Sequence, residues 1–105
     1  MYIGELEELV LLAIRQLGED AYGIPVRATL EEAGRHVSIG TLYVTIDRLE
    51  TKGLIKGRQG EITPERGGKA KRYFRLTGEG ETALRDTEAT RSRLISSSRL
   101  IGGMA

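Results

Sequence analysis

Residues 37–55, VSIGTLYVTIDRLETKGLI, form the stretch that decides the fold. Ser38 predicts the start of a helix, because its hydroxyl can accept hydrogen bonds from the free amides of a first turn. Gly53 predicts where that helix stops. Between them, apolar residues recur at steps of three and four, which predicts a single stripe facing a core. These residues are Ile39, Leu42, Ile46 and Leu49.

The opposite face of this helix has an unusual composition. It carries Gly40, Thr41, Val44, Asp47, Arg48 and Thr51, with Tyr43 and Thr45 on its flanks. A solvated helix face is more often rich in Lys and Glu, whereas a face that lies close to another surface needs small, hydrogen-bonding side chains. We interpret the stretch as a DNA recognition helix. The alternative is a core helix whose outer face has no partner.

Length and composition restrict the class of protein. With 105 residues, 39% of them hydrophobic and 30% charged, the chain has the size and composition of one globular domain. It has no Cys, which excludes disulfides, thiolate catalysis and Cys-type zinc sites. No apolar run predicts a membrane span, and the first ten residues lack the basic region of a secretory signal. We therefore expect a cytoplasmic protein with no membrane partner.

Charge is unevenly distributed along the chain. Residues 1–37 hold three basic residues against seven acidic ones, whereas residues 52–75 hold eight basic residues against two acidic ones, a local charge of +6. Screening limits the reach of a charge to about 10 Å, so local charge matters more to a polyanion than the net charge of the whole chain. A basic segment directly after the predicted recognition helix favours a DNA partner.

The first half of the chain predicts a helix-turn-helix. A helix is expected over residues 5–17, and its apolar residues cover more than one face, so it is either central or shared with a second subunit. A second helix is expected to start at Tyr22-Gly23, with Pro25 in its first turn, and to end at 33–34. We expect its core face to contain Ile24, Val26, Ala28 and Leu30. A short turn then leads into the recognition helix, as in a helix-turn-helix.

A basic hairpin is predicted after the recognition helix. Residues 54–62 and 70–76 are predicted to form short strands, joined by a loop over 63–69. In the second strand, Phe74 and Leu76 alternate with Lys71, Tyr73 and Arg75, which predicts an inner and an outer face. Three helices followed by such a hairpin form a winged helix, with the hairpin as its wing. The predicted fold is therefore mainly α with a small β-hairpin.

A last helix is expected from Gly78, capped by Thr77, with a tail that frays from Ser96. Its middle is polar nearly all round, so it needs a partner, and the first helix of another subunit would provide one. We therefore expect a winged helix-turn-helix domain over residues 1–76 and a C-terminal dimerisation helix with a frayed tail over 77–105. The expected dimer interface consists of Leu9, Leu11, Leu12, Leu84, Leu94 and Ile95.

Three segments carry a family resemblance: LVLLAIRQLGEDAYGIPV, SIGTLYVTIDRLETKGLI and TPERGGKAKRYFRLTGEGETAL, which together cover roughly residues 5–84. In their order and spacing they resemble PadR-family transcriptional regulators. The resemblance implies a dimeric repressor whose third helix enters the major groove and whose wing touches the backbone or minor groove. It also implies an effector, because family members often respond to small aromatic or drug-like molecules. The chain has no Trp, so an indole-lined pocket is not carried over.

Candidate DNA-binding residues lie on the predicted helix and wing. Hydroxyls suit phosphates or base edges, Arg suits phosphate or guanine, and Val suits a thymine methyl. The candidates are Ser38, Gly40, Thr41, Tyr43, Val44, Thr45 and Arg48 on the helix, and Lys69, Lys71 and Arg72 on the wing. Tyr43 packs at the core edge or aims its hydroxyl at phosphate. Arg72 alternates onto the side of Phe74, so its stem can run along the core instead.

Asp47 does not fit a DNA-facing helix, because its carboxylate would repel phosphate. We expect it at the edge of the groove or paired with a nearby Arg or Lys. Two recognition helices related by a two-fold axis would predict a pseudo-palindromic operator in double-stranded DNA, with half-sites about 10 bp apart. The alternative function is a winged-helix protein-interaction module that does not bind DNA, but such a module has no need of a basic wing.

Catalysis and metal binding are not expected. The only histidine, His36, falls in a turn, and the acidic residues at positions 5, 7 and 8 fit a solvated helix start. Gly67-Gly68-Lys69 lacks the rest of a phosphate-binding loop. We therefore expect no catalytic residues, no metal, no cofactor and no enzymatic activity.

Overall fold

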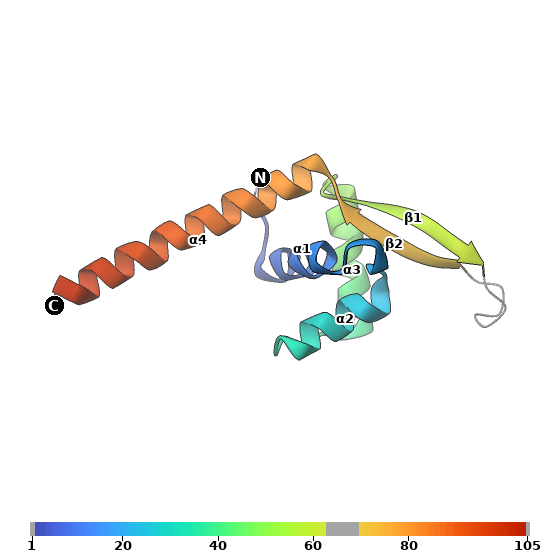
Figure 1. Cartoon of the computed structure of the whole chain (residues 1–105), viewed down its shortest axis with the longest axis horizontal. Coiled ribbons are helices and arrows are strands. Elements are labelled where there is room, and N and C mark those ends of the chain that lie inside the picture. The colour runs from blue at the N-terminus through green and yellow to red at the C-terminus, as the bar shows by residue number, and fades with distance from the viewer. Residues whose placement is uncertain (1, 63–69, 105) are drawn as a thin grey trace.

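The computed structural model describes residues 2–62 and 70–104. In chain order its elements are α1 (Glu5–Leu17), a 3-10 turn η1 (Gly18–Asp20), α2 (Gly23–Glu32), α3 (Ile39–Thr51), β1 (Ile55–Ile62), β2 (Ala70–Leu76) and α4 (Gly78–Met104). The first three helices form a body from which the hairpin and α4 leave in opposite directions (Figure 1). The predicted mainly α fold with a two-stranded hairpin is confirmed.

The core of the body lies between α1, α2 and α3. Leu11, Ile14, Leu42, Ile46 and Leu49 are among its fully buried side chains. Three residues of the apolar stripe predicted for α3 are therefore in the core. The fourth, Ile39, is 43% exposed because it is the first residue of the helix.

The core face predicted for α2 is partly wrong. Val26 and Leu30 are buried, whereas Ile24 is 63% exposed and Ala28 is also exposed. Residues two apart lie about 200° apart around a helix. Once Val26 and Leu30 face the core, Ile24 and Ala28 must point away from it.

Both ends of α3 are fixed as the sequence predicts. The Oγ of Ser38 accepts a hydrogen bond from the Thr41 amide at 3.1 Å. At the other end Gly53 has φ +75°, which favours glycine, and the Leu54 amide donates to the carbonyl of Leu49 at 2.9 Å. The wing therefore begins directly where α3 ends.

β1 and β2 pair in antiparallel register from Ile55 opposite Leu76 to Gln59 opposite Arg72. Phe74 is buried, and its amide donates to the carbonyl of Ala21 at 2.8 Å, so β2 is also attached to the segment before α2. The predicted loop over 63–69, including the candidate Lys69, lies outside the described residues.

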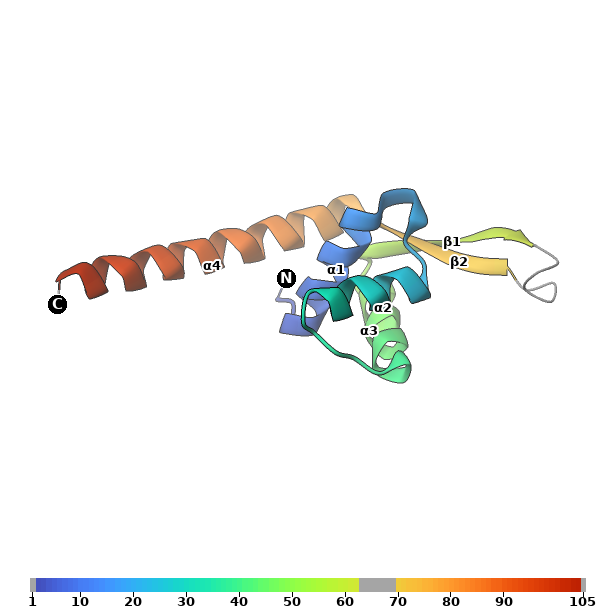
Figure 2. The same ribbon diagram turned by 60° about the horizontal axis from the view of Figure 1, so that its bottom comes forward.

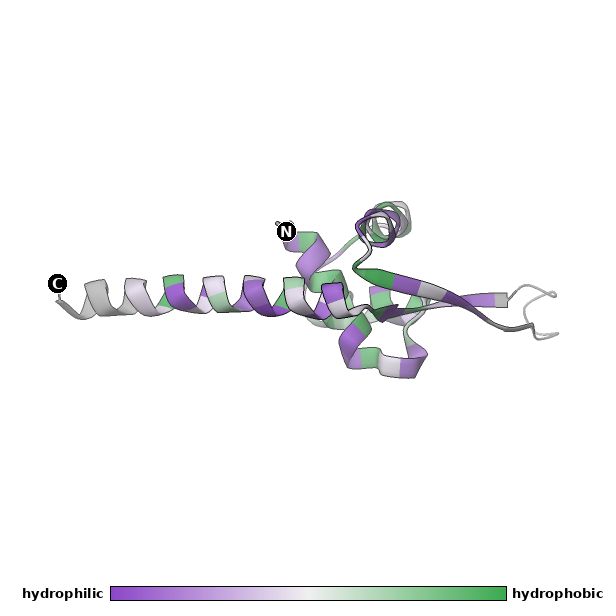
Figure 3. Ribbon diagram, turned by 90° about the horizontal axis from the view of Figure 1, so that it is seen from above, coloured by the Kyte–Doolittle hydropathy of each residue, from purple (hydrophilic) through white to green (hydrophobic). Residues whose placement is uncertain are grey.

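α4 starts in the core and then leaves it. Ala83 and Leu84 are buried, whereas Leu94 and Ile95 are exposed. Apolar and polar residues alternate along the projecting part (Figure 3). The backbone of α4 is helical to Met104, so the helix covers the tail for which we expect fraying, and the fraying itself stays a prediction. The segment after Ser96 contains no Pro, and its glycines come only at 102–103, so nothing interrupts the helical hydrogen bonds there.

The molecule is elongated, with extents of 63 × 27 × 21 Å. Within the described ranges, no helix combines the length and apolarity needed to cross a membrane.

Candidate nucleic-acid interface

The outer face of α3 is open to solvent. Figure 2 shows α3 beside α2 at one edge of the body. Ser38, Gly40, Thr41, Val44 and Arg48 are all exposed, and Val44, the large apolar residue among them, is 52% exposed. Beside this face lies a hollow of about 690 Å³, lined on its other side by the segment around Glu7. The structure thus brings these five predicted residues together on one accessible surface.

Thr45 does not belong to that surface. It is only 4% exposed, and its hydroxyl donates to the Thr41 carbonyl at 2.9 Å. Position 45 lies about 40° from the buried position 49 and about 60° from the buried position 42 around the helix, so its side chain turns inward. The prediction that Thr45 contacts DNA is wrong.

Tyr43 connects α3 to the start of α2. Its ring is 45% exposed, and its hydroxyl lies so close to Gly23 that a Cβ at position 23 would collide with it. Glycine is thus required at the first residue of α2 for this close approach. Tyr43 packs at the edge of the body, with its hydroxyl at the N-terminal end of a helix, where the dipole favours anions.

Asp47 is exposed on the outer face, and no described cation lies within 4.0 Å of its carboxylate. The ion pair that we expected for Asp47 is therefore absent from the described part of the chain. The other expectation, that Asp47 lies at the edge of the DNA groove, stays a prediction.

Glu7 ties α1 to the end of α3. Its carboxylate accepts hydrogen bonds from the Lys52 ammonium at 2.7 and 2.9 Å and from the Gly4 amide at 2.8 Å. Burial acts to raise the pKa of Glu7, but the bonds from Lys52 and Gly4, together with the charges of Lys52 and Arg48, hold the pKa below its ordinary value of 4.5. Glu7 therefore helps to position α3.

Glu7→Gln is expected to lower the free energy of unfolding by about 0.5–1 kcal/mol at pH 7. A carboxyl whose pKa is lowered by folding adds stability above its unfolded pKa and loses it as the pH falls through its folded pKa. Urea unfolding at several pH values should show the gap between the two proteins closing in acid. Glu32→Gln is the control, because Glu32 is exposed on α2 and forms no ion pair with any described residue. A difference in the free energy of unfolding that stays constant with pH would contradict the stabilising role of the ionised Glu7 carboxylate.

The outer face of the wing combines cations with tyrosines. The Lys71 ammonium lies 4.4 Å from the centre of the Tyr22 ring and donates to the Tyr22 hydroxyl at 3.3 Å. The Arg58 guanidinium lies 4.7 Å from the centre of the Tyr73 ring, which meets Tyr22 edge-on, and it also pairs with the Glu19 carboxylate at 3.1 Å. Such cation–π contacts hold basic groups in fixed places while leaving them accessible.

Arg72 lies on the other side of the wing. Its guanidinium makes two hydrogen bonds to the carboxylate of Glu50 on α3, at 2.6 and 2.9 Å, and lies 5.4 Å from the centre of the Phe74 ring. The predicted alternation of Arg72 onto the Phe74 side is confirmed. Its guanidinium is occupied by Glu50 in the free protein, so Arg72 is not a ready phosphate contact.

The expected dimer interface divides into two groups. Leu11 and Leu84 are fully buried in the core of the single chain, so their assignment to an interface is wrong. The first helix is apolar on two faces partly because α4 of the same chain covers one of them. Leu9 and Leu12 are partly buried against the core, while Leu94 and Ile95 are 65% and 45% exposed.

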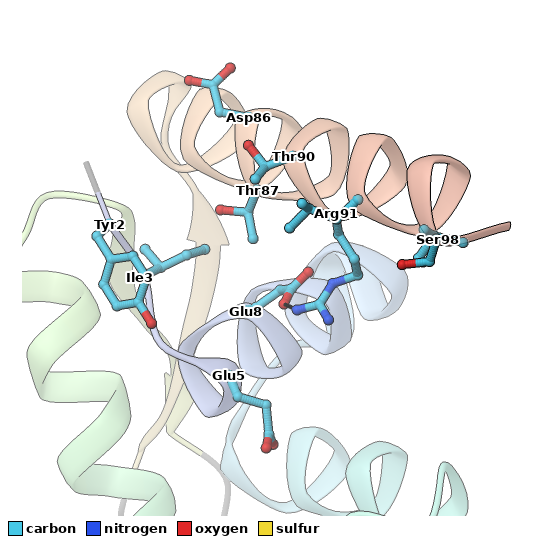
Figure 4. Close-up of a pocket in the computed structure, with 11 residues that line it drawn as sticks. Tyr2, Ile3, Glu5, Glu8, Asp86, Thr87, Thr90, Arg91 and Ser98 are labelled. Atoms are coloured by element: carbon cyan, nitrogen blue, oxygen red, sulfur yellow. Dashed lines mark hydrogen bonds and ion pairs between the residues drawn. The ribbon is translucent and has the colours of Figure 1, made fainter. Parts of the chain in front are cut away.

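A groove of about 730 Å³ runs between the N-terminal segment, α1 and α4. Tyr2, Ile3, Leu94 and Ile95 give it apolar walls. Figure 4 shows Glu8 and Arg91 pointing toward one another across it, and they form an ion pair. In the described ranges no cluster of three or more acidic or histidine side chains has the arrangement of a metal site.

A family model and a curated protein both match this chain over most of its length. The model of the family described as "Transcriptional regulator PadR-like family" matches residues 10–86. A curated relative, "Transcriptional regulator Rv3488" of Mycobacterium tuberculosis, is 34% identical over 86 residues, which cover 82% of this chain and 75% of the relative.

Solved structures are also similar. A PadR-like transcription factor from Bacteroides fragilis is 31% identical with a TM-score of 0.78, covering 91% of this chain and 88% of that one. A PadR-family regulator from Eggerthella lenta is 31% identical with a TM-score of 0.75, covering 91% and 80%. The three helices, the hairpin and α4 therefore correspond to the fold of winged-helix regulators.

Proposed function

We propose that this chain, which belongs to the PadR-like family of transcriptional regulators, is a sequence-specific DNA-binding repressor that acts as a homodimer. The observation that carries the proposal is the division of α3 into two faces. One face buries Leu42, Thr45, Ile46 and Leu49, and the other exposes small, hydroxyl-bearing and cationic side chains. Such a face can approach base edges in a major groove.

The wing supplies the second part of the proposed interface. Lys71 presents its ammonium on the outer face of the wing. Arg58 lies on the same face and is paired in the free protein with the highly exposed Glu19 carboxylate. The +6 segment contains both cations. Contacts from such groups to phosphates position a protein on a duplex without reading sequence. In this proposal α3 reads bases, while the wing binds the backbone or the minor groove.

Dimerisation is proposed through α4. Its projecting part exposes Leu94 and Ile95 to solvent. A helix that is polar nearly all round and projects from the body needs a packing partner to be stable. A second chain packed against α4 and the neighbouring Leu9 and Leu12 would bury these residues. It would also place two recognition helices on one duplex, which supports a pseudo-palindromic operator.

A small aromatic or drug-like effector fits the same region. The groove beside α4 has apolar walls and one ion pair, in which the Glu8 carboxylate is buried and the Arg91 side chain is partly exposed, a composition that suits a small-molecule site. We propose that an effector bound there shifts the two chains relative to one another and releases DNA. The alternative function, a protein-interaction module, predicts no DNA binding at low salt.

Lys71→Ala is expected to weaken binding to every duplex by about fivefold and to reduce the slope of log affinity against log salt by about 1. The reason is the loss of one phosphate contact. Fluorescence anisotropy on a duplex from the chain's own upstream region and on a random duplex would measure both quantities. Lys71→Arg keeps the charge, and Arg93→Ala removes one from α4. If Arg93→Ala changed the slope as much as Lys71→Ala, the wing assignment would be wrong.

A further inference from the structure

Arg72 and Glu50 form a direct connection between the wing and the recognition helix. Two parallel hydrogen bonds, 2.6 and 2.9 Å long, join the guanidinium to the carboxylate. This two-pronged geometry fixes direction as well as distance, because both groups are planar. Lysine at position 72 could not reproduce it.

The surroundings of Arg72 are built to hold its side chain in place. The guanidinium lies over the Phe74 ring and crosses β1 at Gly57. A Cβ at position 57 would come within 2.8–3.0 Å of three guanidinium atoms, so any larger residue there would displace Arg72. Glycine in the middle of a strand marks a close approach of this kind.

The base of the wing is attached separately. The Thr77 hydroxyl donates to the Gly53 carbonyl at 2.6 Å, and the Thr77 amide donates to the Leu54 carbonyl at 3.0 Å. These bonds lie where both strands meet the body. Farther out, Lys71 and Arg58 contact Tyr22 and Glu19, which lie before or at the start of α2. Without a further contact the hairpin would still be free to tilt relative to α3.

Arg72 provides this contact on the side of α3. It precedes Thr77 by five residues, which corresponds to about 16 Å along a strand. Phe74 is held by Ala21 on the side of α2, whereas Arg72 is held by Glu50 on the side of α3. The pair thus sets the angle between the wing and the helix that is proposed to read bases.

We propose that Arg72 and Glu50 are positioning residues that brace the wing against the recognition helix, so that both reach one duplex together. The inference rests on the proposed DNA-binding function. It assigns Arg72 a different role from a phosphate contact. The side chains are 56% and 23% exposed, so the pair contributes little to stability, and its effect is on geometry.

Glu50→Gln separates the two roles of Arg72. Removing a negative charge from a DNA-binding surface should by itself strengthen binding, and it would free Arg72 for phosphate. If the pair positions the wing, the opposite is expected: Glu50→Gln and Arg72→Ala should each lower the affinity for DNA about tenfold. A tenfold loss corresponds to about 1.4 kcal/mol of binding free energy. The double variant should be no worse than either single one. The exchanged pair, Glu50→Arg with Arg72→Glu, should recover most of the affinity.

Anisotropy on DNA selected by the wild-type protein would measure these affinities, with urea unfolding to confirm that every variant is folded. Unchanged or tighter binding by Glu50→Gln, with a loss only in Arg72→Ala, would overturn the brace. Gly57→Val, which displaces the guanidinium without removing either charge, should behave like Arg72→Ala.

A second measurement does not depend on DNA. Because the chain has no Cys, nitroxide labels can be placed at Asp47→Cys on α3 and Gln59→Cys on β1. In labelled chains diluted with unlabelled ones, double electron–electron resonance should show a narrow distance distribution. It should broaden in Glu50→Gln and Arg72→Ala and narrow again in the exchanged pair. A width unaffected by Glu50→Gln would overturn the proposal, whereas a wild-type protein that binds no duplex would overturn only the proposed function.

Discussion

Val44→Glu is expected to lower affinity for selected DNA at least about 100-fold, because like charges brought together in an interface cost several kcal/mol. Val44 is 52% exposed in the middle of the outer face of α3, between Thr41 and Arg48. A carboxylate there would meet phosphates and the acceptor-rich floor of the major groove. The fold should tolerate the change, since glutamate has a higher helix propensity than valine.

Anisotropy titrations would measure the affinity, and urea unfolding should change by no more than about 0.5 kcal/mol. Gln16→Glu is the matched control, because it adds the same charge at an exposed position of α1. It should bind DNA nearly as well as wild type. If Val44→Glu bound as well as Gln16→Glu, α3 would not be the reading element.

Leu94→Glu is expected to raise the dissociation constant of the dimer at least about 100-fold, because an unpaired charge would be buried where an apolar side chain packs. Leu94 is 65% exposed in the single chain, so the monomer should remain folded. Binding to a two-half-site operator should fall by a similar factor, since each recognition helix would then bind alone. Sedimentation velocity at micromolar concentration would measure the dimer.

Ser96→Glu is the control for this change. It lies on the same helix, about 160° away from Leu94 around the helix axis, and is also exposed. It should leave the dimer intact. A Leu94→Glu protein that sediments as wild type would remove α4 from the proposed interface.

The sequence predicted those parts of the fold that depend on local patterns. Ser38 and Gly53 mark both ends of α3 because capping and positive φ depend on the residues themselves. The placement of Arg72 and Phe74 on the same side of β2 was also predicted from the alternation of residues along the strand. The exposed outer face of α3 followed from the same periodicity, except at Thr45, whose side chain faces inward.

Features that depend on packing between distant segments could not be predicted. Glu50 and Arg72 are 22 residues apart, and their pairing requires the register of the hairpin and the rotation of α3. Leu11 and Leu84 looked available to a second chain, because the sequence does not reveal that α4 folds back over α1. A strand glycine such as Gly57 was the one available signal for a close approach.

The central claim is that α3 reads DNA sequence. Selection of genomic fragments by the purified protein, run beside Val44→Glu, tests it most directly. The account predicts that wild type enriches a pseudo-palindrome with half-sites about 10 bp apart, and that Val44→Glu enriches nothing. Equal enrichment by both proteins, or none by wild type at low salt, would contradict it.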